Sequence, residues 1–315
     1  MATYVAGLDI GGTKSLGVVL DDQGVVVAES RVPTPHGAEA LLATVEMLVE
    51  DLANVVGVVS AVGLGVPGLV TTDGLFRFAP NLIAVSELPV GDLLRERFDV
   101  PVIVNNDANC AVWAEHEVGG AVGVDHAVLI TIGTGIGTGL LIDGQIERGA
   151  HGFAGEMGHT IVDAAGAACA CGRRGCWETI ASGSGLAIMG RELVAAGRGT
   201  AILILAGGDA ESIRGEHVTR AARRGDDEAL GLLRQFAWNI GLGLANVSAM
   251  LDPELVLLGG GLVAELDILL DDIRAAHDEL VMGAGHREPL RIEPVGLGER
   301  SGAMGAALLG AEAIS

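Results

Sequence analysis

Aromatic residues make up only 3% of this 315-residue chain, so its core must be built mainly from smaller aliphatic side chains. Hydrophobic residues nevertheless account for 50% of the sequence, which is enough for a substantial core. Lysine and arginine together number 19 against 41 acidic residues, which gives a net charge of −22. This shortage of positive charge disfavours nucleic acid and acidic membrane surfaces as partners.

Cysteine is also scarce, and no secretory signal is predicted because no basic region precedes an apolar stretch at the start. The longest uncharged run, residues 52–72, contains Pro67 and four glycines, so we interpret it as a buried strand and a loop rather than a membrane span. The sequence therefore predicts a cytoplasmic protein. Disulfides are rare in that reducing compartment, which weakens any disulfide interpretation of the four cysteines.

Glycine, in contrast, is abundant, and its clusters reveal an internal repeat. DIGGTKSLGVVLD at 9–21 aligns without a gap with TIGTGIGTGLLID at 131–143. Both segments are typical of a strand, a glycine-rich turn, a second strand and an acidic turn. Two unrelated hairpins of similar composition are the alternative. If the halves are related, each begins with a turn whose backbone N–H groups can donate to a phosphate.

Alternating strand and helix patterns predict an α/β fold. Strands are expected at 3–10, 15–20, 25–30, 57–66, 101–105, 128–132, 138–142, 255–258 and 290–295. Helices are expected at 38–53, 107–118, 180–196, 217–224, 227–250, 264–281 and 302–312. We expect two domains, a smaller one formed by 1–118 plus 301–315 and a larger one formed by 119–300, which contains the cysteine cluster described below.

Three polar residues, Asn105, Asn106 and Asp107, follow a buried strand and precede a predicted helix. Ligands of open α/β sheets bind at the carboxyl ends of strands, so Asp107 is a candidate functional carboxylate. A carboxylate is also favourable at a helix start, and the alternative is that Asp107 serves only as an N-cap. In either case we expect the helix start to keep Asp107 ionised near neutral pH with an ordinary pKa.

The segment CACGRRGC places Cys169, Cys171 and Cys176 within eight residues, downstream of His159. Cys3His is a known composition of structural zinc sites, and three thiolates with an imidazole favour zinc over magnesium or calcium. A disulfide with a spare thiol and chance clustering are the alternatives. The fourth cysteine, Cys110, is expected to be a small core residue, and His151, the rival histidine, is assigned to a loop.

Taken in order, the motifs resemble the ROK family of sugar kinases, and within it the bacterial glucokinases. The resemblance spans nearly the whole chain and rests on DIGGTK (9–14), GLGVPG (63–68), PNL (80–82), NNDAN (105–109), TIGTGIGTG (131–139), GEMGH (155–159), CACGRRGCWE (169–178) and LLGGG (257–261). It implies an actin-like ATPase (ribonuclease H-like) fold of two domains, with sugar and ATP in the interdomain cleft.

The resemblance also implies roles for single residues. It assigns structural Zn²⁺ to His159, Cys169, Cys171 and Cys176, and sugar contacts to Asn81, Asn106, Asp107, Glu156, His159 and Glu178. Asp107 becomes the catalytic base. It assigns the phosphates of ATP and, through water, Mg²⁺ to Asp9, Gly11, Gly12 and Thr13. It assigns a second phosphate loop to Gly133, Thr134 and Gly135, and the adenosine to Gly259, Gly260 and Gly261. Lys14 is one of the few cations beside these loops and has no assigned role.

The expected activity is therefore ATP-dependent phosphorylation of glucose at its 6-hydroxyl, in a homodimer or homotetramer. The alternatives are another hexose (N-acetylmannosamine, N-acetylglucosamine, fructose or mannose), polyphosphate as the donor, or a non-catalytic sugar sensor. Many relatives continue the Asn-Leu of the third motif with Pro-Gly-Trp, whereas Ile83, Ala84, Val85 and Ser86 follow here. That change affects the expected substrate and leaves the reaction class unaltered.

Overall fold

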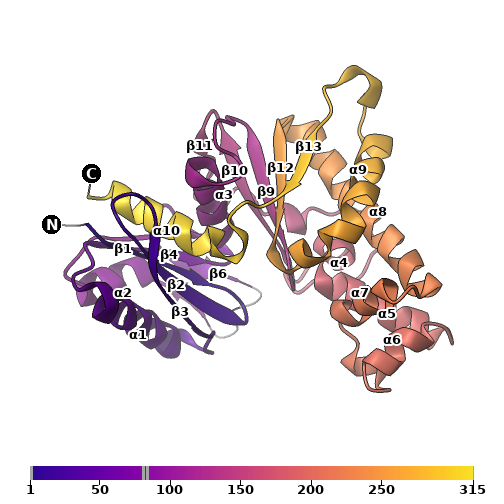
Figure 1. Cartoon of the computed structure of the whole chain (residues 1–315), viewed down its shortest axis with the longest axis horizontal. Helices are drawn as coiled ribbons and strands as arrows, with labels where there is room; N and C mark the ends of the chain where they lie inside the picture. The colour runs from indigo at the N-terminus through magenta and orange to yellow at the C-terminus, as the bar shows by residue number, and fades with distance from the viewer. Residues whose placement is uncertain (1–2, 80–81, 83–84, 315) are drawn as a thin grey trace. The chain divides into compact units, whose positions relative to one another are not determined.

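The computed structural model describes residues 3–79, 82 and 85–314 and shows a mixed α/β architecture (Figure 1). The chain divides into two compact units. Unit 1 consists of Met1–Leu129, Gly137–Glu156 and Val295–Ser315, and unit 2 of Ile130–Ile136 and Met157–Pro294. Within the ranges given above, no helix combines the length and apolar character needed to cross a membrane.

The first sheet has five strands in the order β3-β2-β1-β4-β8. Its strands are β1 (Val5–Ile10), β2 (Lys14–Leu20), β3 (Val26–Pro33), β4 (Ala61–Val66) and β8 (Val102–Asn106). Strands β1, β2 and β3 form an antiparallel meander, whereas β4 pairs parallel to β1 and β8 parallel to β4. The carboxyl ends of β1, β4 and β8 therefore meet at one edge of the sheet.

Helices and a small sheet complete unit 1. They are α1 (Ala38–Val56), α2 (Val90–Arg97), α3 (Asp107–Val118) and α10 (Ser301–Glu312), with the strands β5 (Leu69–Val70), β6 (Phe76–Phe78) and β7 (Ser86–Leu88) in a three-stranded sheet. The C-terminal helix α10 packs against α3, β1 and β4. The core beneath α1 is almost entirely Leu, Val, Ile and Ala, with Phe76 as its fully buried aromatic residue among those described.

The second sheet repeats the pattern of the first, in the order β11-β10-β9-β12-β13. Its strands are β9 (Ala127–Ile132), β10 (Ile136–Ile142), β11 (Gln145–Ile146), β12 (Leu255–Gly259) and β13 (Arg291–Pro294). In both sheets three successive strands lie on one side and two later strands on the other. The shared order agrees with the repeat that the two glycine-rich hairpins predict.

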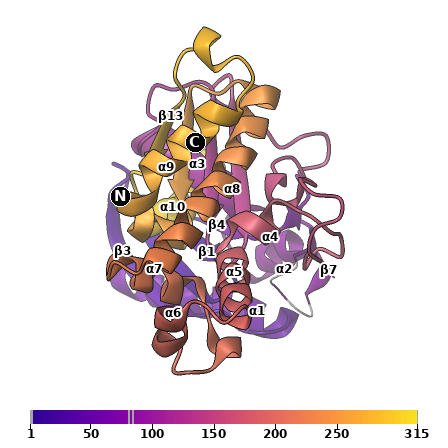
Figure 2. The same cartoon turned by 90° about the vertical axis from the view of Figure 1, so that its right-hand side faces the viewer.

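The described helices between Met157 and Pro294 belong to unit 2. They are α4 (Glu178–Ala181), α5 (Gly183–Ala195), α6 (Thr200–Leu205), α7 (Gly215–Arg223), α8 (Asp227–Leu251) and α9 (Leu266–Leu280), with short 3₁₀ turns η1 (Met157–His159), η2 (Ala210–Ser212), η3 (Gly260–Glu265) and η4 (Ala284–His286). The 3₁₀ turn η5 (Gly298–Arg300) precedes α10 in unit 1. Helix α7 contacts α5, α6 and α8, and these four helices form the group seen in Figure 2.

The predicted α/β class and most of the predicted elements are confirmed. The single helix expected at 180–196 is wrong, because the chain breaks between α4 and α5 at Ser182. The Ser182 hydroxyl accepts a hydrogen bond from the Gly185 N–H and so caps a new helix there. Helices α2 and α6, the small sheet and β11 were not predicted, because each is too short to carry a clear hydrophobic period.

Glu115 is a fully buried carboxylate that ties the end of α3 to the start of α10. Its Oε2 accepts hydrogen bonds from the backbone N–H groups of Gly120 (2.7 Å) and Gly296 (2.8 Å). Its Oε1 accepts from the Leu297 N–H (2.9 Å) and the Ser301 hydroxyl (2.7 Å). Four donors replace the water that the ion loses on burial, so the charge is well solvated inside the protein.

Replacing Glu115 with glutamine should destabilise the chain by roughly 3 kcal/mol or more. The new NH₂ group would face two buried donors and leave them without an acceptor. Urea unfolding would measure the change, with Glu117→Gln, an exposed position on the same helix, as the matched control. A loss below about 1 kcal/mol, or an equal loss in the control, would contradict this role for the carboxylate.

Candidate active site and metal centre

Two acidic residues meet at the carboxyl edge of the first sheet. Asp9 lies near the end of β1 and pairs with Gly65 of β4, which in turn pairs with Asn105 of β8. Asp107 follows as the first residue of α3. Gly65 has no side chain between them, and a Cβ there would lie 3.4 Å from the Asp107 Cα. The parallel strands thus bring Asp9 and Asp107 to one place.

The two carboxyl groups hold their protons more tightly than free aspartate does. Burial, together with the negative charge of Asp107 and against the opposing charge of Lys14, raises the pKa of Asp9 to about 7. Burial also raises the pKa of Asp107 to about 6, although the backbone N–H groups of Ala108 and Asp107 itself oppose the rise. The expected ordinary pKa of Asp107 is therefore wrong, because desolvation outweighs the favourable helix start.

The interpretation of Asp107 as an N-cap is also wrong, because Asn106 holds that position. The Asn106 Oδ1 accepts hydrogen bonds from the backbone N–H groups of Ala108 (2.9 Å) and Asn109 (3.1 Å). Its Nδ2 donates to the Gly68 carbonyl oxygen at 3.1 Å. Asn106 thus has a structural role besides the predicted sugar contact, whereas helix capping does not account for Asp107.

The first glycine-rich turn, residues 11–13, joins β1 to β2 directly beside Asp9. The Gly11 N–H donates to the Lys14 carbonyl oxygen (3.0 Å), and the Thr34 hydroxyl donates to the Gly11 carbonyl oxygen (2.6 Å). These bonds fix the turn while Gly12 and Thr13 stay exposed. Exposed backbone N–H groups in a fixed turn suit an anionic ligand.

Helix α10 closes in on Asp9 through Gly302, a residue that sequence reasoning missed. A Cβ at Gly302 would lie 2.6 Å from the Asp9 Oδ2, so any larger residue would displace the carboxylate. Gly302 follows Ser301, whose hydroxyl is held by Glu115. The sequence does contain a signal for Glu115. It is the one acidic residue on a helix face whose other positions, 108, 111 and 112, are apolar.

The second glycine-rich turn, Gly133, Thr134 and Gly135, occupies the equivalent place between β9 and β10. The Gly133 N–H donates to the Gly135 carbonyl oxygen (3.0 Å), and the Gly133 carbonyl oxygen accepts from the Gly183 N–H (2.8 Å). Gly260, at the end of β12, packs on the neighbouring backbone, since a Cβ there would lie 2.7 Å from the Ile132 oxygen. Unit 2 thus brings together the turn at 133–135 and the run at 259–261.

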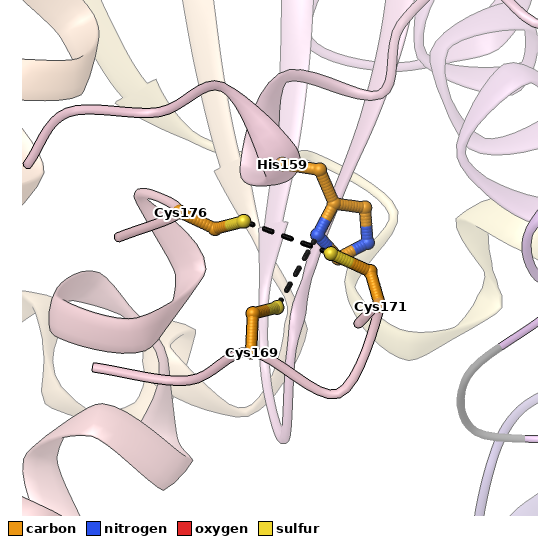
Figure 3. A group of neighbouring side chains, drawn as sticks. All are labelled: His159, Cys169, Cys171 and Cys176. Atoms are coloured by element: carbon orange, nitrogen blue, oxygen red, sulfur yellow. Dashed lines mark hydrogen bonds between the residues drawn. The ribbon is translucent and has the colours of Figure 1, made fainter. Parts of the chain in front are cut away.

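His159, Cys169, Cys171 and Cys176 form one cluster, in which the four candidate ligand atoms all lie within 4.8 Å of one another (Figure 3). The sulfurs of Cys171 and Cys176 are 3.7 Å apart, as are the Cys169 sulfur and the His159 Nδ1. A tetrahedral zinc ion with bonds of about 2.3 Å to sulfur needs sulfur atoms about 3.8 Å apart. The cluster therefore fits a structural zinc site.

The state of the cysteines also fits a metal site, because no disulfide joins them. All four cysteines are free, and Cys110 is fully buried, as predicted for a core residue. Burial raises the pKa of Cys169 to about 12 and raises that of Cys176 as well. Thiolates at these positions therefore need a nearby cation, which a divalent metal supplies directly.

The chain around the cluster is folded tightly enough to present its ligands together. Val162 N–H donates to the Gly175 carbonyl oxygen (2.8 Å), and Cys169 N–H donates to that of Arg173 (2.8 Å). Gly175 has a φ of 69° and lies so close to Asp163 that a Cβ would be 1.5 Å from the Asp163 oxygen. Only glycine fits there, which explains the glycine before Cys176.

Two residues after Cys176 connect the cluster to the rest of unit 2. Trp177 is buried, donates from Nε1 to the Asn239 oxygen (2.8 Å), and packs against Gly243 of α8. The Glu178 Oε2 accepts from the Ile136 N–H (2.9 Å), and its Oε1 lies 3.7 Å from the Cys169 sulfur. Glu178 thus contacts a side chain of the cluster directly.

Among the other residues predicted to contact the sugar, Glu156 and His159 lie close together in the chain at η1. Asn81 lies outside the described residues, as do Ile83 and Ala84 of the unusual loop. Glu156 is partly buried and directly precedes η1, which carries His159. In Figure 3 the His159 Nδ1 faces Cys169, whereas its second ring nitrogen points away from the sulfurs.

The chain is similar to known proteins over nearly its whole length. Residues 5–313 match the ROK family. A glucokinase of Streptomyces coelicolor is 37% identical over 309 residues, which cover 97% of each chain. An N-acetylmannosamine kinase of Yersinia pseudotuberculosis is 31% identical over 255 residues, which cover 80% of this chain and 81% of the relative.

A solved structure is similar over its whole length. The ROK family glucokinase of Streptomyces griseus, in complex with glucose and AMPPNP, has a TM-score of 0.88 and 35% identity. The match covers 99% of this chain and 100% of that one.

Proposed function

This chain belongs to the ROK family, and we propose that it is a glucokinase that transfers the γ-phosphoryl group of ATP to the 6-hydroxyl of glucose. The observation that carries the proposal is the pair of carboxylates at the carboxyl edge of the first sheet, beside a glycine-rich turn. The similar Streptomyces griseus protein was solved with glucose and an ATP analogue, which supports both substrates.

In this proposal Asp107 is the general base. A sugar hydroxyl is a weak nucleophile until its proton has an acceptor, and a carboxylate within hydrogen-bond reach supplies one. With a pKa of about 6, Asp107 is largely ionised at neutral pH yet more basic than an exposed carboxylate. Asp107 accepts the proton as the hydroxyl oxygen bonds to phosphorus and the bond from phosphorus to ADP breaks.

The glycine-rich turns are assigned to the phosphates of ATP, with Asp9, Gly11, Gly12 and Thr13 at the first turn and Gly133, Thr134 and Gly135 at the second. Gly259, Gly260 and Gly261 are assigned to the adenosine. Burial and the charge of Asp107 raise the pKa of Asp9 and so disfavour its ionised form. A nearby cation would favour that form, so we assign Mg²⁺ to Asp9 through water. Mg²⁺ would neutralise phosphate charge, which few side chains here can do.

Sugar contacts are assigned to Asn81, Asn106, Asp107, Glu156, His159 and Glu178. Their amide and imidazole groups can both donate to and accept from sugar hydroxyl groups, whereas their carboxylates accept from them. Structural zinc would hold His159 through Nδ1 and fix Glu178 through the short link from Cys176. The ion thereby orders sugar ligands and takes no part in phosphoryl transfer.

A coupled assay of ADP release across a panel of sugars tests the substrate. We expect glucose to give the highest kcat/KM, ahead of mannose, fructose, N-acetylglucosamine and N-acetylmannosamine. Activity with ATP but none with polyphosphate is expected for the donor, because the run at 257–261 is assigned to a nucleoside. Activity confined to another sugar would overturn the glucose assignment, and no activity with any would overturn the kinase assignment.

N-acetylmannosamine is the best-supported second substrate, because a relative with that activity is 31% identical to this chain. The unusual sequence after Leu82 falls at the loop that the family resemblance places near the sugar. Assembly as a homodimer or homotetramer remains a prediction. Light scattering would test it by measuring the mass of the particle in solution.

A further inference from the structure

Lys14 has an unusual position, because it is the residue that follows the first glycine-rich turn and it begins β2. Its Nζ donates to the Glu299 Oε1 at 2.6 Å. The other oxygen of that carboxylate, Oε2, accepts from the Arg31 Nη1 at 2.9 Å. The side chains of Lys14, Glu299 and Arg31 are 51%, 62% and 42% exposed. Two cations thus share one carboxylate at the surface.

Both Lys14 and Glu299 are tied to the neighbourhood of Asp9. The Lys14 carbonyl oxygen closes the turn by accepting from the Gly11 N–H (3.0 Å). The field of its ammonium group reaches the Asp9 carboxylate, whose pKa it lowers against the stronger effect of burial. Glu299 lies three residues before Gly302, which packs directly on Asp9. The ion pair therefore stands beside the turn assigned to phosphate.

The charges favour an exchange of partners when a polyphosphate arrives. Glu299 stays ionised, because Lys14 and then Arg31 lower its pKa. An ion pair this exposed contributes little to stability, so Lys14 can leave it at low cost. A nucleotide di- or triphosphate presents several negative charges and binds an ammonium group more strongly than one carboxylate does. Arg31 remains on Glu299 and keeps it in place.

We propose that Lys14 binds the phosphates of the nucleotide and that Glu299 holds the lysine until they arrive, so that this pair sets nucleotide affinity. The proposal rests on the kinase function proposed above. It adds a cation to a phosphate site otherwise built from backbone groups and Mg²⁺. Glu299 competes with the nucleotide for the same ammonium group, and its removal must therefore tighten binding.

Calorimetry of the whole protein with ADP and Mg²⁺, AMP and adenosine tests this directly, without any turnover. Lys14→Met keeps the aliphatic stem and should weaken ADP binding roughly tenfold. Adenosine binding should change less than about twofold, because it has no phosphate. Glu299→Gln should tighten ADP binding by about two- to fivefold, and added salt should reduce the gain.

Asp92→Asn is the matched control, because Asp92 is an exposed carboxylate paired with Arg95 at 2.8 Å in α2 of the same unit. It changes the net charge equally and should leave ADP affinity unaltered. In the double variant Lys14→Met/Glu299→Gln the tightening should vanish, since the freed ammonium group is gone.

Three outcomes would overturn the inference: unchanged ADP affinity in Lys14→Met, an equal loss for adenosine and ADP, or equal tightening in Glu299→Gln and Asp92→Asn. If the wild-type chain binds ADP normally, such a result leaves the proposed function standing. A wild-type chain that binds neither ADP nor adenosine would instead overturn the proposed function together with this inference.

Discussion

Replacing Asp107 with asparagine is expected to lower kcat by roughly 10²–10⁴ while the fold and the metal content stay intact. The amide keeps the size of the side chain, and its Oδ1 can still accept from the Ala108 N–H, as Asp107 does at 2.8 Å. It cannot accept the proton of a sugar hydroxyl. Steady-state kinetics with saturating glucose and ATP would measure the loss, with Asp92→Asn as the control.

The position of the helix cap makes this substitution a decisive test of Asp107. Asn106 provides the N-cap of α3 and remains in the variant, so the helix start does not depend on Asp107. A loss of turnover therefore cannot be ascribed to a lost cap. A folded asparagine variant with near-normal kcat would contradict the assignment of Asp107 as the general base.

The same variant should be more stable than the wild-type protein at alkaline pH. Burial raises the pKa of Asp107 from 3.8 to about 6, so the folded state binds its proton more tightly than the unfolded state does. That stabilising protonation is complete below pH 3.8 and is lost as the pH rises through about 6.

At pH 8 the wild-type carboxylate is charged and partly desolvated, a cost that the neutral amide does not carry. Removal of that cost should stabilise the asparagine variant by on the order of 1 kcal/mol. Urea unfolding should show this gain at pH 8 and little difference near pH 4. An equal difference at both values would contradict the raised pKa of Asp107.

The sequence predicted those features that depend on short-range pattern. The repeated glycine-rich hairpins predicted two related halves, and in the structure the two hairpins occupy the same places in two sheets of matching strand order. The spacing of Cys169, Cys171 and Cys176 predicted one compact cluster, because a tight turn brings residues so close in sequence together. Asp107 was recognisable because it follows a buried strand.

Features that depend on contacts between distant segments could not be predicted. Glu115 binds Gly296 and Leu297, which are more than 180 residues further along the chain, so no local pattern identifies its partners. The raised pKa of Asp107 arises from burial at the sheet edge, whereas the sequence shows only the helix start. The Asn106 cap was missed because the choice between neighbouring polar residues depends on backbone angles.

Replacing Cys176 with serine is expected to abolish zinc binding and to destabilise the chain by on the order of 4 kcal/mol. Cys176 is fully buried, and a serine hydroxyl at this position is a poor zinc ligand. Without the ion, the other three ligands are no longer held together. For a domain of this size the melting temperature should fall by roughly 10 °C. Elemental analysis and calorimetry would measure the two effects.

Cys110→Ser is the matched control, because it makes the same chemical change at the other fully buried cysteine, outside the cluster. It should retain one zinc per chain. In Cys176→Ser, we expect Trp177 and Glu178, the next two residues, to become less ordered. The Glu178 carboxylate accepts a hydrogen bond from the Ile136 N–H, which follows the second glycine-rich turn. Glucose affinity should then fall together with stability, because Glu178 is proposed to bind the sugar. Full zinc content in Cys176→Ser would contradict Cys176 as a zinc ligand. Unchanged glucose affinity in its zinc-free form would contradict the link from the cluster to the sugar site through Glu178.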